Sequence, residues 1–141
     1  MNPAFKAACA AAGALAMVAI APATRAAERC STRSFEVYFE KERSRLSAES
    51  EHAIHIAQRT FHGCAIDHVR IVGATEARLD PTYNMRLARR RAGRVADVLV
   101  AGGWPRDRLE IIAIGPAGAG EGDKVNPMRR RVKVVVEARP A

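Results

Sequence analysis

The chain has 141 residues, which is the length of one ordinary domain. A composition of 48% hydrophobic and 27% charged residues excludes a disordered or fibrous protein, and 5% aromatic residues argue against a stacking platform for single-stranded nucleic acid. The formal net charge of +8 favours an anionic partner without identifying it.

Residues 1–26 predict a signal peptide. Lys6 precedes a small, apolar run over residues 7–23, and two small-residue cleavage patterns end at Ala23 and Ala26. We expect cleavage after one of them. A single membrane anchor is the alternative, but the run is rich in alanine and short of the ~20 apolar residues that a span requires. The mature chain is therefore expected in the periplasm, without a transmembrane span.

Two cysteines follow the predicted signal peptide, because Cys9 lies inside it. Neither Cys9 nor Cys30 follows the small-residue box of a lipoprotein, so lipid attachment is not expected. In an oxidising compartment the pair Cys30 and Cys64 predicts one disulfide, and two free thiols are the alternative. Cys30 belongs to a lead-in over residues 27–33.

The next segment predicts a strand, a helix and a second strand. Aromatic and β-branched residues alternate with polar ones over 35–39, which is typical of a half-buried strand. Ser47 is a suitable helix cap, followed by acidic residues at the positive end of the helix, and Gly63 is a plausible end. Residues 66–73 then have the pattern of a strand.

The C-terminal half predicts one long helix and two strands. A polar loop over 74–81 precedes a helix over 82–101, a strand over 109–114, a Gly- and Pro-rich loop over 115–127 and a strand over 132–137. Residues 138–141 are expected to form a loose tail. Two helices and four strands in this order indicate a two-layer α+β sandwich over residues 34–137.

The long helix places a charge where an apolar residue is expected. On a helical wheel, Arg91 and Asn84 fall inside the apolar arc formed by Leu87, Val95 and neighbouring positions. A cation directed toward a core requires a partner. Either a carboxylate of a ligand or an internal one, from Glu76 or Asp80, satisfies this requirement. The remaining arginines of the helix form a solvated basic face: Arg86, Arg89, Arg90 and Arg94.

Several short motifs together resemble the OmpA-like domain that is shared by OmpA, Pal and MotB proteins. They are Gly73-Ala74-Thr75-Glu76, Tyr83-Asn84, Leu87-Ala88-Arg89-Arg90-Arg91-Ala92 with Val95, and Arg130-Arg131-Val132. The similarity covers nearly all of residues 34–137. It implies a β-α-β-α-β-β fold with a mixed four-stranded sheet.

The resemblance also implies a non-catalytic module, without a cofactor, that binds the peptide stem of peptidoglycan at its diaminopimelate residue. In the family an aspartate receives the ammonium of that residue and a helix arginine pairs with its carboxylate. The corresponding residues are Glu76 and Arg91, with Asn84 and Arg130 as supporting contacts. Glu76 is one methylene longer than the family aspartate, and Arg129 stands where the family has asparagine. Association with the cell wall or the outer membrane would follow.

The sequence leaves three other functions to consider. The change from aspartate to Glu76 is compatible with a protein-interaction module that no longer binds peptidoglycan. In such a module Glu76 and Arg91 pair with each other, and the basic face binds an envelope protein. The predicted export and the lack of interleaved aromatic residues argue against binding of nucleic acid. His52 and His55 have helical spacing but no evident third ligand, so a solvated face is expected there rather than a metal site.

Overall fold

The computed structural model describes residues 22–141. Most of the predicted signal peptide therefore lies outside the described residues. Helix α1 (Pro22–Arg29) covers both predicted cleavage positions, a helix that the sequence patterns did not indicate. No helix of the described residues combines the length and the apolar character that crossing a bilayer requires.

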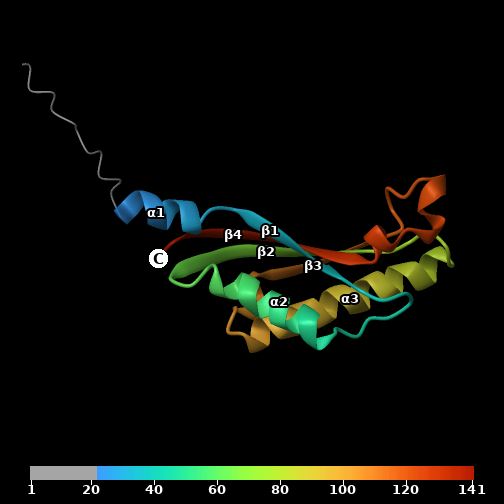
Figure 1. Ribbon diagram of the computed structural model, residues 1–141, viewed down its shortest axis with the longest axis horizontal. Coiled ribbons are helices and arrows are strands. Elements are labelled where there is room, and N and C mark those ends of the chain that lie inside the picture. Colours follow the sequence, from blue (N-terminus) through green and yellow to red (C-terminus); the bar gives the residue numbers. More distant parts are fainter. Residues whose placement is uncertain (1–21) are drawn as a thin grey trace, which may run out of the picture.

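One mixed sheet of four strands forms the first layer (Figure 1). It contains β1 (Arg33–Tyr38), β2 (Cys64–Ala74), β3 (Leu109–Gly115) and β4 (Arg131–Pro140), in the order β1-β4-β2-β3. The β2–β3 pair is parallel and the other two pairs are antiparallel. This arrangement confirms the predicted α+β fold.

Two helices, α2 (Ala48–Arg59) and α3 (Pro81–Ala101), form the second layer on one face of the sheet (Figure 1). The predicted cap of α2 is present, since the Ser47 side chain accepts a hydrogen bond from the Ser50 backbone N–H at 3.1 Å. The helix ends at Arg59, earlier than expected, and Gly63 with φ +81° belongs to the turn into β2.

The core lies between the helices and the sheet, because alternate strand residues and one stripe of each helix face the same space. The Phe61 and Trp104 rings meet edge to face at 5.7 Å, so Trp104 anchors the turn after α3. The core members are Val37, Phe39, Ile54, Phe61, Val69, Ile71, Ala92, Val95, Ala96, Leu99, Trp104, Val132, Val134 and Val136.

The C-terminal strand and the preceding loop differ from expectation. Residues 138–141 are not a loose tail, because β4 continues to Pro140, which pairs with Cys64 of β2. The segment after β3 contains two 3₁₀ helices, η2 (Glu121–Val125) and η3 (Pro127–Arg129), and η1 (Arg106–Arg108) precedes β3. Short 3₁₀ turns lack the hydrophobic periodicity that marks longer helices.

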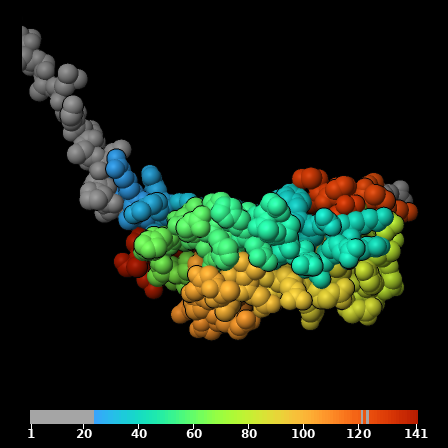
Figure 2. Space-filling view, turned by 60° about the horizontal axis from the view of Figure 1, so that its bottom comes forward, coloured from blue at the N-terminus to red at the C-terminus, as the bar shows by residue number. Residues whose placement is uncertain are grey.

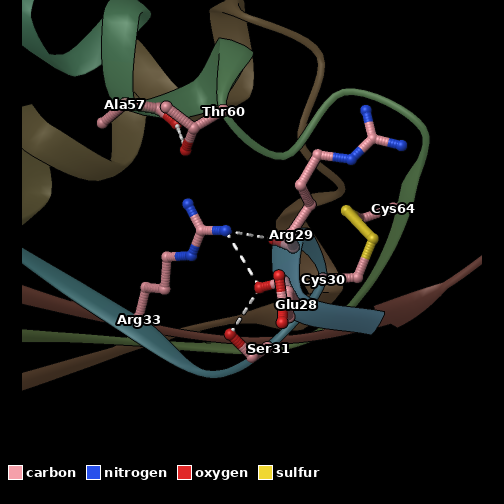
Figure 3. Close-up of a disulfide and its surroundings, with 8 residues drawn as sticks. All are labelled: Glu28, Arg29, Cys30, Ser31, Arg33, Ala57, Thr60 and Cys64. Atoms are coloured by element: carbon pink, nitrogen blue, oxygen red, sulfur yellow. Dashed lines mark hydrogen bonds between the residues drawn. A yellow bond between two sulfur atoms is a disulfide. The ribbon is translucent and has the colours of Figure 1, made fainter. Parts of the chain in front are cut away.

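The predicted disulfide is present between Cys30, after α1, and Cys64, at the start of β2 (Figure 3). Backbone carbonyls at the end of α1 are also bound. The Arg33 guanidinium donates to the Glu28 and Arg29 carbonyls, and the Ser31 hydroxyl donates to the Glu28 carbonyl. These contacts attach α1 to the sheet at its end opposite η2 and η3 (Figure 1).

The close approach of β2 and α3 predicts that Gly73→Ala destabilises the fold. A Cβ atom at Gly73 would lie 2.3 Å from the Ala88 carbonyl oxygen, so two backbone segments would have to separate. We expect a loss of about 1–3 kcal/mol in the free energy of unfolding, measured by urea denaturation. Gly93→Ala is the matched control, because a Cβ there meets nothing within 4 Å and alanine favours the helix. Equal stability of both variants would contradict this packing.

The disulfide predicts a redox-dependent stability. The bridge joins residues 34 positions apart. Closing a loop of this size stabilises a fold by about 4 kcal/mol in the chain-entropy model. We expect dithiothreitol, or the double change Cys30→Ser with Cys64→Ser, to lower the urea midpoint. An unchanged midpoint after complete reduction, verified by thiol titration, would contradict the prediction.

Candidate functional site

Four predicted binding residues come from different elements but lie at one end of the sheet. Glu76 follows β2, Asn84 and Arg91 belong to α3, and Arg130 immediately precedes β4. Figure 1 shows why these segments meet, since the end of β2, the start of α3 and the η2–η3 segment share one end of the molecule. A small cavity there is lined by Glu42, Thr75, Glu76, Arg78, Leu79, Asn84, Leu87 and Arg91.

Arg91 is the central residue of this site. Only 1% of its surface is exposed, although it carries a guanidinium group. Its Nε donates to the Arg43 carbonyl at 2.7 Å, Nη2 to the Glu40 carbonyl at 3.1 Å and Nη1 to the Ala74 carbonyl at 3.4 Å. Of the two alternatives for Arg91, an internal ion pair is therefore wrong for the described residues, since three backbone carbonyls bind its guanidinium and no carboxylate does.

The electrostatic environment of Arg91 follows from its burial. Desolvation lowers the pKa of its guanidinium to about 10. The Glu76 charge opposes this shift and the Arg130 charge adds to it. The group also lies over the Phe39 ring, 5.2 Å from the ring centre. Arg91 remains a cation at neutral pH, within the electrostatic field of a carboxylate that it does not contact.

Glu76 pairs with Arg130 instead of Arg91. The Arg130 Nη2 donates to the Glu76 Oε1 at 3.0 Å, and both side chains are largely buried. The sheet explains this choice, because Gly73 pairs with Val132 and so Glu76 leaves β2 beside the residues that enter β4. Asp80, the other expected partner of Arg91, caps α3 by accepting from the Tyr83 N–H at 3.0 Å.

Asn84 is buried and organises the loop before α3. Its Nδ2 donates to the Leu79 carbonyl at 2.9 Å, and its backbone N–H donates to the Asp80 carbonyl at 2.9 Å. These bonds fix the turn between Glu76 and the helix. The position of Asn84 inside the apolar arc thus reflects a buried polar group that is satisfied by its own loop.

Two buried polar atoms beside Glu76 have no hydrogen-bond partner within the described residues. They are the Thr75 Oγ1 and the Arg130 Nε. Leaving a buried donor or acceptor unpaired costs about 1–3 kcal/mol. Both atoms belong to residues that are adjacent to Glu76, in sequence or through its ion pair. They are therefore candidates for contact with a bound polar ligand.

A segment that the motifs did not indicate covers the site. Residues 39–47 connect β1 to α2, and they supply the Glu40 and Arg43 carbonyls that hold Arg91. Glu42 has a left-handed φ of +57°, and its carboxylate pairs with Arg78 at 2.6 Å. The remaining cavity is about 10 Å³, close to the space of one water molecule. Every residue has a backbone carbonyl, so contacts through carbonyls do not depend on the residue type. The sequence therefore could not predict that this segment covers the site.

Arg129 also has a role that its residue type did not predict. Its Nε donates to the Thr75 carbonyl at 2.9 Å and its Nη2 donates to the Ala117 carbonyl at 2.8 Å. Arg129 thereby fastens the η3 turn to the loop that carries Glu76. A long side chain with several donors can make these contacts, and an asparagine at the same position reaches less far.

Comparison with known proteins identifies the family. The OmpA family model matches residues 38–133. The chain is 32% identical over 108 residues to the outer-membrane lipoprotein YfiB of Pseudomonas aeruginosa, covering 74% of this chain and 64% of that protein. It is 34% identical over 73 residues to the peptidoglycan-associated lipoprotein of Legionella pneumophila, covering 50% and 42%. The match thus spans less than two thirds of each relative.

Solved structures share the fold at low identity. The OmpA-like domain of FopA1 from Francisella tularensis superposes with a TM-score of 0.68 at 23% identity, covering 77% of this chain and 73% of that chain. The C-terminal domain of Helicobacter pylori MotB gives 0.62 at 20%, covering 72% and 83%. The peptidoglycan-associated lipoprotein of Burkholderia pseudomallei gives 0.57 at 23%, covering 72% and 88%. The chain therefore belongs to the OmpA family, whose domains are non-catalytic binding modules.

Proposed function

We propose that this protein binds peptidoglycan and recognises the diaminopimelate residue of its peptide stem at the Glu76–Arg91 site. The observation that carries the proposal is a buried cation beside a carboxylate with which it does not pair. The end of diaminopimelate that bears an ammonium and a carboxylate has the complementary charges. Relatives named as peptidoglycan-associated lipoproteins support the same ligand class.

Arg91 is assigned to the ligand carboxylate. Three backbone carbonyls engage three of the five N–H groups of its guanidinium, so two N–H groups remain for an anion. A planar guanidinium suits a carboxylate, because its paired donors match the two oxygens. The carbonyls also fix the orientation of the group before the ligand arrives, which reduces the entropic cost of binding.

Glu76 is assigned to the ligand ammonium. Its Oε1 accepts from Arg130, and its Oε2 makes no contact of hydrogen-bond length within the described residues. Arg130 in this arrangement positions the carboxylate, while the second oxygen receives the ligand. Asn84 acts through the loop, since its bond to the Leu79 carbonyl holds the turn that follows Glu76.

Ligand entry requires the contact between Glu42 and Arg78 to open. A cavity of about 10 Å³ cannot hold an amino-acid side chain, and the Glu42–Arg78 pair joins the two loops that flank it. Both members of this pair are partly exposed, so the ion pair is a weak closure. The Glu42 and Arg78 side chains can therefore separate at modest cost. The backbone of the segment stays in place, because its Glu40 and Arg43 carbonyls hold Arg91 and Phe39 belongs to the core.

An exported location completes the proposal. The predicted signal peptide directs the chain across the inner membrane, and the Cys30–Cys64 bridge is of a kind that persists in oxidising compartments. The periplasm is such a compartment in a bacterium, and it contains the peptidoglycan. We place the protein there, in association with the wall or the outer membrane.

The assignment of Glu76 is tested by calorimetry with a diaminopimelate-containing stem tripeptide. Glu76→Gln should weaken binding tenfold or more, since a hydrogen bond to a charged group contributes roughly 1.5–3 kcal/mol. Glu76→Asp should keep binding within a few-fold, because it keeps the charge. Glu110→Gln, which removes an exposed acid of β3, is the control.

Two results would contradict the assignment. Wild-type affinity in Glu76→Gln would place the ligand elsewhere. If wild type does not bind the tripeptide but the Glu76→Asp variant does, the longer side chain of Glu76 prevents ligand binding. This result would favour a protein-interaction module.

The covering segment predicts that Glu42→Gln strengthens stem binding. Loss of the ion pair with Arg78 makes opening easier, and an exposed pair contributes only about 0.2–1 kcal/mol, so the affinity should rise up to about fivefold. Glu36→Gln, which removes the exposed pair with Arg131, is the matched control. Weaker binding by Glu42→Gln would mean that the segment is part of the bound site and does not obstruct it.

A further inference from the structure

Four arginines on the outer side of α3 have no carboxylate partner in the part of the chain that the structure describes. We call Arg86, Arg89, Arg90 and Arg94 the α3 arginine face. All four are exposed, and none of them forms an ion pair with any carboxylate of the described residues. The sequence predicted a solvated basic face here, and the structure confirms its exposure.

Some exposed arginines outside α3 are paired with acids. Arg70 pairs with Glu137 at 3.0 Å, Arg139 with Asp67 at 3.0 Å and Arg106 with Asp97 at 3.5 Å. The α3 arginine face differs from these three positions, because all four of its charges are unmatched within the described residues and lie together on one helix.

The spacing of these residues opposes helix stability. Arg86, Arg90 and Arg94 follow one another at intervals of four, so they are neighbours on the helix surface about 6 Å apart along its axis. Like charges at this spacing repel one another and destabilise a helix. An anion that lies along the row removes this repulsion, so the row is suited to a partner with several negative charges.

The α3 arginine face is continuous with the proposed stem site. Arg90 is adjacent to Arg91, and its charge contributes to the lowered pKa of Arg91. The covering segment lies beside exposed α3, in cyan above yellow in Figure 2, and contributes the exposed cations Lys41, Arg43 and Arg45. Arg45 and Arg94 line a common groove of about 610 Å³, together with the acids Glu51 and Asp97. A peptide stem bound at the Glu76–Arg91 site would therefore leave that site close to these exposed cations.

We propose that the α3 arginine face binds the carboxylates of a second peptide stem on the same peptidoglycan polymer. The inference rests on the proposed function, since the first stem occupies the Glu76–Arg91 site. Peptidoglycan repeats its stems along each glycan strand, and free carboxylates recur with them. Binding of the first stem raises the local concentration of the next, so weak and exposed charge contacts become effective. The protein would then prefer intact wall to soluble fragments.

The test compares three ligands at several salt concentrations: purified sacculi, a soluble stem tripeptide, and vesicles containing phosphatidylglycerol. The variant carries Arg86→Gln, Arg90→Gln and Arg94→Gln together. The control carries Arg70→Gln, Arg108→Gln and Arg139→Gln, which removes the same charge from exposed positions elsewhere. Thermal melting verifies that both fold, and the first variant should be at least as stable as wild type, because repulsion is removed.

We expect the α3 variant to lose affinity for sacculi on the order of tenfold at low salt while it binds the tripeptide as wild type does. The control should bind sacculi like wild type, and the difference should shrink as salt screens the contacts. Equal sacculus affinity of variant and wild type would overturn the inference. So would equal losses in variant and control, or a loss confined to vesicles, which would indicate a lipid surface.

Failure of the proposed function gives a different pattern. Suppose that wild type does not bind the tripeptide but the α3 variant still has a lower affinity for sacculi than wild type. The α3 arginine face then contacts the wall, and the Glu76–Arg91 assignment is wrong. If wild type binds no sacculi at all, both proposals are overturned.

Discussion

The site depends on how one buried guanidinium is satisfied. Burying the Arg91 cation is unfavourable unless oxygens replace its water. Three backbone carbonyls do so, two from the segment after β1 and one from the end of β2. The end of β2 and the segment after β1 must therefore both approach the middle of α3. The same close packing requires Gly73, where a side chain would meet the Ala88 carbonyl. Folding therefore also fixes the orientation of the Arg91 guanidinium.

A second consequence is that the charges of the site are separated rather than neutralised. Because carbonyls bind Arg91, Glu76 pairs with Arg130 instead. The Glu76 and Arg91 charges of the proposed site therefore lie close to each other without contact. A zwitterionic ligand can connect them, whereas an ion pair between them would have filled the site. Arg130 and Arg129 both come from the turn before β4, so this turn positions the acid and anchors its loop.

Much of this arrangement was predictable from sequence patterns. The alternation over 35–39 and the apolar stripe of α3 predicted the layers, and Arg91 was identified because a charge occupied an apolar position. Its partners were not predictable, since carbonyl oxygens exist at every residue and only the tertiary fold selects them. Helix α1 was missed because its composition matched an exported leader. The extension of β4 to Pro140 depends on long-range pairing with Cys64.

The most direct measurement follows the arginine side chains during ligand binding. In a ¹⁵N-labelled protein, the buried Nε–H and Nη–H groups of Arg91 should give resolved signals, because carbonyl bonds protect them from exchange. Titration with the diaminopimelate tripeptide should shift the Arg91 signals in a saturable way, with the affinity found by calorimetry. Saturable binding that leaves the Arg91 signals unmoved would contradict the claim that its free N–H groups hold the ligand carboxylate.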